Sequence, residues 1–310
     1  MSTKKLFSDR RFWPIFLTQF FGAFNDNFFK NGLVILITFK AATLWGLNSE
    51  QLVALAGGVF ILPFFLFSAS AGQIADRFEK ATLIRAVKIF ELVIMLIAAY
   101  GFINHKLEEL FLALFLMGVH SSIFGPVKYS YLPQLLNSEA ELLQANSLFQ
   151  LGTFLAILVG TILGGIAISM NPGGEYWVSV GALAFAAFGL ATSLFVAPAG
   201  GQDKGLKIDW NPISPTFRIF RETLKNREVF LSILGISWFW FFGAAMLSLF
   251  PPLGKKIMGG GEGVVTFFLA LFSVGIVLGS MQCKRLSGDK LEPGLVPFGS
   301  LGLSIFAADI

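Results

Sequence analysis

The chain has 310 residues, of which 55% are hydrophobic and 14% are charged, and its formal net charge is +4. Water-soluble domains usually carry about 25% charged residues, so this composition excludes an ordinary soluble globule and indicates a protein embedded in lipid. The mean hydropathy of +0.72 agrees with that interpretation.

Long apolar segments follow one another along the chain, and each is long enough to cross a bilayer as a helix. The segments are too long and too continuous for barrel strands, whereas helices pair their own backbone groups in lipid. We therefore expect an all-α polytopic membrane protein. The expected spans are residues 12–39, 51–73, 82–103, 110–132, 146–170, 176–197, 229–252 and 264–283, with a last one that begins near Leu295. The first segment is too long for a signal peptide and lacks a small-residue cleavage site, so we expect it to remain as a helix.

The basic residues predict the orientation, because Lys and Arg collect on the cytoplasmic side of a membrane. The N-terminal segment and every second loop after it hold most of them, whereas the opposite loops hold only Lys40, Lys106, Lys255 and Lys256. We therefore expect a multi-pass protein with a cytoplasmic N-terminus. This distribution explains the positive net charge without a nucleic-acid partner.

A polar, Gly-rich interval at residues 198–227 divides the chain after the sixth expected span. It predicts three parts: a six-helix transmembrane bundle at residues 1–197, a cytoplasmic linker at 198–227, and a partial second bundle at 228–310. A weak internal repeat supports two related bundles, because the second and eighth spans both end in a Gly that precedes a short basic turn, at Gly72 and Gly279.

The segment that follows the second span, G-Q-I-A-D-R-F-E-K at residues 72–80, resembles a motif of the major facilitator superfamily, G-x-x-x-D-R-x-G-R-K. The matching residues are Gly72, Asp76, Arg77 and Lys80, whereas Glu79 stands where Gly is usual. The resemblance implies the major facilitator fold, with these four matching residues in a conformational gating loop. It also implies twelve helices, so we expect the chain, which stops within a ninth span, to be part of a longer or fused protein.

Polar and charged groups within the expected spans need an explanation, because an Asp, Lys or Arg at the centre of a membrane helix costs roughly 2.5 to 3.5 kcal/mol on insertion scales. Asp26 and Lys30 are four residues apart and share one helix face with Gln19, so we expect a polar face directed into a cavity. The full set comprises Gln19, Asn25, Asp26, Asn27, Lys30, Lys88, Glu91, His120, Ser121, Ser122, Lys128 and Tyr129.

Each of these charges has a structural and a functional interpretation. Local neutralisation would pair Asp26 with Lys30 and Lys88 with Glu91, leaving no site. We favour that interpretation for Lys88 and Glu91, since a Lys near the cytoplasmic half can extend its ammonium toward water. For Asp26, which has Asn on both sides, we favour a function. A lone mid-helix histidine such as His120 is more often an interhelical hydrogen-bonding group than a proton relay.

Two further alternatives stay open. Lys128 follows Gly125-Pro126-Val127, which weakens its helix, and serves either as a topological positive charge or as a binding group. Gly160 and Gly164 form G-x-x-x-G, for which we expect helix packing rather than a site.

Two short elements, G-A-F-N-D-N at residues 22–27 and F-G-P-V-K-Y at residues 124–129, resemble those of the lysophospholipid transporters of Gram-negative bacteria. The similarity continues through residues 72–76, Lys88 and residues 145–148. The resemblance implies inward movement of a lysophosphatidylethanolamine-like lipid across the cell inner membrane. It further implies re-acylation by an acyltransferase or acyl-activating enzyme, as a partner or as a fused domain.

The substrate that this resemblance implies fits the polar residues of the spans. A zwitterionic head group needs a cation for its phosphate and an acid for its ammonium, which Lys128 and Asp26 supply. The expected substrate-binding residues are Asp26, Asn27, Lys30, His120, Lys128 and Tyr129.

An enzyme and an exporter are the competing functions. The acyltransferase signature H-x-x-x-x-D is absent, because His105 and His120 are followed five residues later by Leu110 and Gly125. The Gly-rich run at residues 259–263 lacks the Lys and Ser or Thr of a phosphate-binding loop. The single cysteine, Cys283, excludes an intrachain disulfide and has no partner for a metal site. From these three observations together we expect no enzyme activity, cofactor or metal. A drug or small-solute exporter on the same scaffold remains the alternative.

Overall fold

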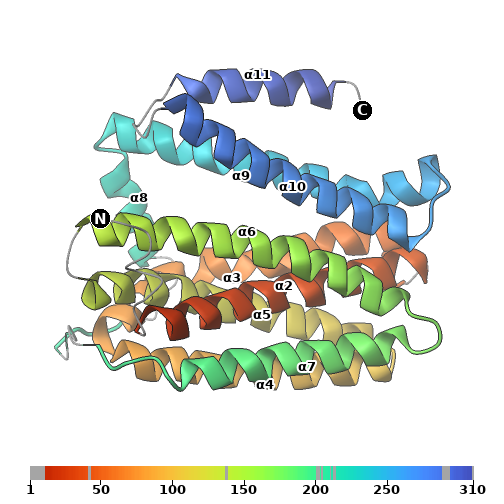
Figure 1. Cartoon of the computed structure of the whole chain (residues 1–310), viewed down its shortest axis with the longest axis horizontal. Helices are drawn as coiled ribbons and strands as arrows, with labels where there is room; N and C mark the ends of the chain where they lie inside the picture. The colour runs from red at the N-terminus through yellow and green to blue at the C-terminus, as the bar shows by residue number, and fades with distance from the viewer. Residues whose placement is uncertain are drawn as a thin grey trace. The chain divides into compact units, whose positions relative to one another are not determined.

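A computed structural model describes residues 11–40, 43–136, 139–199, 203, 205–209, 211, 214–287 and 294–308 (Figure 1). These residues form helices, and the β pairing among them is a single isolated bridge between Leu44 and Leu47. The chain is therefore all-α, as the sequence predicted.

The helices follow the expected spans closely. They are α2 (Phe12–Phe39), α3 (Ser49–Arg77), α4 (Lys80–Ile103), α5 (Leu107–Leu135), α6 (Glu139–Ser169), α7 (Gly174–Ser193), α8 (Ser214–Thr223), α9 (Arg227–Pro252), a π-helical turn (Leu253–Ile257), α10 (Glu262–Ser287) and α11 (Leu295–Ala307). Every expected span falls on one helix, and the short α8 lies within the predicted linker. The chain divides into two compact units, Met1–Ala270 and Leu271–Ile310, so the first contains α2 to α9. The predicted bundle and linker boundaries remain predictions.

Among the described residues, six helical segments are long and apolar enough to cross a membrane. They are α3, α4, α5, the part of α6 at Ala145–Ser169, α7 and the segment Arg227–Ile257. Large hydrophobic side chains cover the outer surfaces of these helices, including Phe65 at 66% exposure and Leu96 at 54%. Such a surface suits lipid and not water, so the protein is a polytopic membrane protein.

Helix α2 differs from these helices, because polar residues interrupt its 28-residue length and make it less apolar than they are. Most of its surface is instead buried against other helices, chiefly α6 and α7, with smaller contacts to α3 and α5. Several polar side chains on this helix, among them Gln19, Asn25 and Asn31, therefore face protein rather than lipid.

Close backbone contact fixes α2 against α6. A Cβ atom added at Gly160 would stand 2.5 Å from the carbonyl oxygen of Phe24, and one at Gly164 would overlap the carbonyl oxygen of Phe28. The G-x-x-x-G sequence thus has the packing role predicted for it, and the contact sets the depth at which the polar residues of α2 lie.

In the turn between α3 and α4, Glu79, which stands where the superfamily motif usually has Gly, has a structural role. Its carboxylate caps α4, accepting hydrogen bonds from the backbone N–H groups of Ala81 at 2.8 Å and Thr82 at 2.6 Å. It also accepts one from Ala199, beyond α7, at 3.0 Å. Burial acts to raise the pKa of Glu79, but these hydrogen bonds outweigh it and lower the pKa to about 2.

Candidate functional site

Asp26 on α2 is held by a neutral group. Its Oδ2 accepts a hydrogen bond from Ser121 Oγ on α5 at 3.0 Å, while Oδ1 is buried without a hydrogen-bond partner among the described residues. Lys30, one turn along α2, directs its Nζ over the ring of Phe60 on α3, 4.1 Å from the centroid. Within the described ranges the two residues form no ion pair, so the local pairing considered above is not formed.

Lys128 on α5 also has a neutral partner. Its Nζ donates to Gln19 Oε1 on α2 at 2.7 Å and lies 5.1 Å from the ring centroid of Tyr129. Gln19 in turn donates through Nε2 to Thr153 on α6. No carboxylate pairs with Lys128 in the part of the chain that the structure describes. Its charge is therefore held in place but not neutralised.

A second group of polar residues is fully enclosed and mutually paired. Lys88 and Glu91 on α4 form an ion pair of 2.6 Å between Nζ and Oε2, and both side chains are 0% exposed. Asn25 Nδ2 on α2 donates to Glu91 Oε1 at 3.0 Å. His120 Nε2 on α5 lies 3.3 Å from Glu91 Oε2, a distance of ionic contact without an aligned hydrogen bond. We call these four residues the buried cluster.

The buried cluster corrects one argument from the sequence. Lys88 does pair with Glu91, as local neutralisation predicted, but its ammonium does not extend toward water. It lies 4.8 Å from the ring centroid of Phe124 and is enclosed between helices. The i,i+3 spacing revealed this pair. The sequence singled out Asn25 and His120 as polar residues of the spans, but nothing in it paired them with Glu91, because they lie on other helices.

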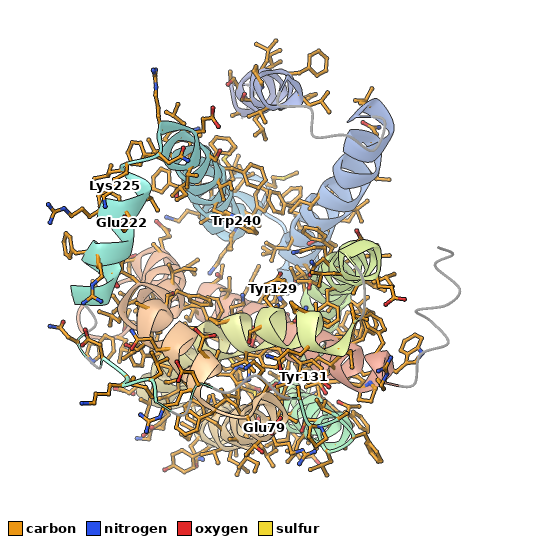
Figure 2. The ribbon with its side chains drawn as sticks, turned by 90° about the vertical axis from the view of Figure 1, so that its left-hand side faces the viewer. Glu79, Tyr129, Tyr131, Glu222, Lys225 and Trp240 are labelled. Atoms are coloured by element: carbon orange, nitrogen blue, oxygen red, sulfur yellow. The ribbon has the colours of Figure 1, made fainter. Side chains whose placement is uncertain are left out.

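The other two predicted binding residues, Asn27 and Tyr129, make hydrogen bonds outside the groups described above. Asn27 Nδ2 donates to the Ala23 carbonyl oxygen of its own helix at 2.8 Å. Tyr129, labelled in Figure 2, is 45% exposed, and its hydroxyl accepts a hydrogen bond from Gln150 at 3.0 Å. Of the predicted binding residues, Asp26 and His120 both contact Ser121, and Lys128 contacts α2 through Gln19.

The predicted gating loop lies where α3 meets α4. Asp76 is exposed, Arg77 stands 5.7 Å from the ring centroid of Phe78, and Lys80 begins α4 as a buried side chain. A Cβ atom at Gly72 would meet nothing within 4 Å.

The segment after α7 is attached to this turn. The Asp203 N–H donates to the carbonyl oxygen of Asp76 at 3.1 Å, and the Asp209 N–H donates to Gln73 Oε1 at 2.7 Å. Part of the predicted linker therefore contacts the predicted gating loop directly.

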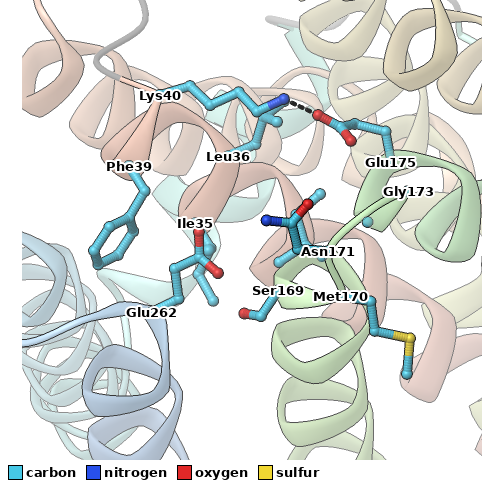
Figure 3. A pocket seen from close by; sticks show the side chains of 12 residues that line it. Ile35, Leu36, Phe39, Lys40, Ser169, Met170, Asn171, Gly173, Glu175 and Glu262 are labelled. Carbon is cyan, nitrogen blue, oxygen red and sulfur yellow. Dashed lines mark hydrogen bonds and ion pairs between the residues drawn. The ribbon is translucent and has the colours of Figure 1, made fainter.

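A pocket of about 280 Å³ lies at the end of α2, beside the turn between α6 and α7 (Figure 3). Lys40 and Glu175 form an ion pair across one side of it, and Glu262 lines the other. The pocket does not include Asp26, Lys30 or Lys128. Among the described residues, no three His, Cys, Asp or Glu side chains gather as a metal site would require.

Comparison with known proteins assigns the family. The profile of the Major Facilitator Superfamily matches residues 12–308. The chain is 27% identical to the lysophospholipid transporter LplT of Yersinia enterocolitica, over 94% of this chain and 70% of the relative. It is also 27% identical to proteins of the same name from Cronobacter sakazakii, over 96% and 71%, and Serratia proteamaculans, over 94% and 71%. The chain belongs to the Major Facilitator Superfamily and is therefore a multi-pass membrane transporter rather than an enzyme.

Proposed function

We propose that this protein moves a lysophospholipid, of the lysophosphatidylethanolamine type, inward across the cell inner membrane. The name shared by the relatives from Yersinia, Cronobacter and Serratia supports the substrate class. A lysophospholipid delivered inward is a substrate for re-acylation, so an acyltransferase or acyl-activating enzyme would consume it.

The observation that carries the proposal is the state of two charges. Asp26 and Lys128 have opposite signs and lie on two helices. Among the described residues their hydrogen-bond partners are the neutral side chains of Ser121 and Gln19. A charge removed from water gains most from a counter-charge, so each site favours a ligand group of the opposite sign. A zwitterionic head group supplies both: its ammonium would bind at Asp26 and its phosphate at Lys128.

The other predicted binding residues have subsidiary roles in this proposal. Lys30 adds a second positive charge one turn from Asp26, with its ammonium over the ring of Phe60. The exposed ring of Tyr129 lies beside the ammonium of Lys128 and would contact the glycerol or the start of the acyl chain. Asn27 borders Asp26 on α2, and His120 contributes through Ser121.

Orientation and movement complete the proposal. We place the N-terminus and the linker at residues 198–227 in the cytoplasm, because the basic residues gather there. The linker would join a six-helix bundle at residues 1–197 to a second bundle from residue 228. Gly72, Asp76, Arg77 and Lys80 would form the gate between them, and contacts such as that of Asp203 with Asp76 would transmit motion of the linker to it.

Head-group chemistry tests the proposed site. The protein is reconstituted in vesicles and its uptake of labelled ethanolamine-headed and glycerol-headed lysophospholipids is measured. Asp26→Asn should remove the preference for the ethanolamine head group. Lys128→Gln should instead reduce the uptake of both lipids at least severalfold. The matched control is Lys225→Gln, because that lysine is exposed and pairs with Glu222 away from the site (Figure 2). Normal transport of both lipids by both site variants would refute the assignment.

The alternative function is tested in the same vesicles. We expect that a panel of cationic drugs is not transported and does not inhibit uptake of the lysophospholipid. Drug export without lysophospholipid uptake would replace the proposal with a small-solute exporter on the same scaffold.

A further inference from the structure

Helix α8, within the predicted linker, differs in character from the spanning helices. It is strongly amphipathic, although its overall hydrophobicity is low. Residues 214–227, which contain α8 and the turn after it, hold four basic residues and one acidic residue. Such a helix is too short to cross a bilayer, but its pattern is typical of helices that lie in a membrane surface.

The apolar and the basic side chains of α8 occupy neighbouring faces. Phe217, Phe220 and Leu224 recur with helical spacing and are exposed by 65%, 50% and 50%. Arg218 and Arg221 are exposed on the adjacent face. Neither guanidinium forms an ion pair or a hydrogen bond with another described residue. An uncovered apolar face therefore lies beside two positive charges that have no counter-charge within the described residues.

The position of α8 places this face at the membrane surface. The helix contacts α3 and α9 and runs across their axes (Figure 1, Figure 2). Its Phe220 ring lies 6.3 Å from the ring of Phe230, in the first turn of α9. Because α9 begins the span Arg227–Ile257, Phe220 lies at the level where that span enters the apolar layer.

The short connection to α9 keeps α8 at that level. Three residues separate the end of α8 at Thr223 from the start of α9 at Arg227, and they can cover at most about 14 Å. The one acidic residue, Glu222, is paired with Lys225 at 2.6 Å. A bilayer with anionic phospholipids offers acyl chains to the apolar face and phosphates to the arginines beside it.

We propose that α8 is a membrane-surface helix that binds the anionic phospholipids of the bilayer around the protein. Phe217, Phe220 and Leu224 enter the boundary between head groups and acyl chains, and the guanidinium groups of Arg218 and Arg221 bind lipid phosphates. This lipid site is separate from the transport site at Asp26 and Lys128. The inference goes beyond the proposed function and requires neither lysophospholipid transport nor a particular orientation of the protein.

Fluorescent labels locate the apolar face. In a Cys283→Ser background, an environment-sensitive fluorophore is attached at Phe217→Cys or at Glu222→Cys, and the protein is reconstituted in lipid nanodiscs. The label at position 217 should be quenched by brominated acyl chains and protected from acrylamide in the water. The label at position 222, on the other side of α8, is the matched control and should be quenched by acrylamide. Leu224→Cys repeats the test on the apolar face if the change at Phe217 disturbs the helix.

The lipid composition of the discs tests the arginines. The ratio of docked to undocked α8 should be higher in discs that contain phosphatidylglycerol than in discs of phosphatidylcholine alone, and salt should reduce the difference. Each arginine should contribute about fivefold to this ratio. Arg218→Gln combined with Arg221→Gln should therefore remove most of the dependence on phosphatidylglycerol. Lys106→Gln, which removes an exposed charge at the start of α5, should behave as wild type.

Three results would overturn the inference: equal access of acrylamide to positions 217 and 222, docking that is independent of phosphatidylglycerol, or docking that the double arginine variant leaves unchanged. Protection of position 217 in native membranes but not in nanodiscs would assign the face to a protein partner and would overturn it as well. None of these measurements uses lysophospholipid uptake, so failure of this inference is distinguishable from failure of the proposed function.

Discussion

Two groups of charged side chains lie within the helices and differ in how fully they are paired. One is the buried cluster, and the other is Asp26 and Lys128, which have neutral partners. In the buried cluster, Glu91 meets an ammonium, an amide and an imidazole from three helices. Asp26, one residue beyond Asn25 on α2, accepts a hydrogen bond from a serine hydroxyl and leaves one oxygen without a partner among the residues that the structure describes. Both groups are sheltered from lipid, so depth in the membrane does not distinguish them.

The difference separates structural from functional charge. A fully paired charge stabilises the packing of its helices and has little left for a ligand, whereas a charge with one neutral partner gains when a counter-charge arrives. The sequence left open that Asp26 is also a paired, structural charge, since Lys30 is four residues away and suitably placed to neutralise it. The tertiary structure directs Lys30 to Phe60 instead.

The largest expected effect is on the buried cluster. Glu91→Gln leaves Lys88 as an uncompensated buried charge, which should cost about 3 to 5 kcal/mol and lower the thermal unfolding temperature in detergent markedly. Thermal unfolding followed by size-exclusion chromatography measures the change. Adding Lys88→Met removes the unpaired ammonium, so the double variant should recover much of the loss. A single variant as stable as wild type would remove the distinction between the two groups.

An intermediate effect is expected at Glu79, which is as fully hydrogen-bonded as Glu91 but lies outside the spans. Glu79→Ala removes the cap of α4 and should cost about 1 kcal/mol. Because hydrogen bonding lowers the pKa of Glu79 from 4.5 to about 2, its contribution is present above pH 4.5 and is lost as the pH falls toward 2. The difference in unfolding temperature between wild type and Glu79→Ala should therefore shrink on acidification.

Glu79→Asp is the control for that experiment, because Asp is a good capping residue but reaches less far toward Ala199. It should retain most of the stability of wild type. Equal losses in the Ala and Asp variants would mean that the bond to Ala199, and not the cap, carries the effect.

The smallest expected effect on stability is at Asp26. Asp26→Asn is the same carboxylate-to-amide change as Glu91→Gln, yet it removes a charge that forms no ion pair among the described residues. The amide oxygen can still accept the hydrogen bond from Ser121, so the unfolding temperature should change by the equivalent of about 0.5 kcal/mol or less. A loss as large as that of Glu91→Gln would place Asp26 among the structural charges.

The sequence determined the helices, because runs of apolar residues long enough for a bilayer have few other solutions. Every expected span coincides with a helix, and the family resemblance drawn from residues 72–80 is confirmed by the match over residues 12–308. Local pairs were partly predictable: spacing revealed Lys88 with Glu91, and G-x-x-x-G revealed the packing of α6 on α2.

Only the tertiary structure decided which charges are neutralised. The contacts of Glu91 with Asn25, Asp26 with Ser121 and Lys128 with Gln19 join residues that are far apart in the chain, on different helices. They therefore depend on the rotation and depth of each helix. Composition leaves that rotation open, because a helix surrounded by other helices no longer needs a single apolar face. The sequence thus determined that charges lie in the membrane, and the packing of α2, α4 and α5 decided which remain available to a ligand.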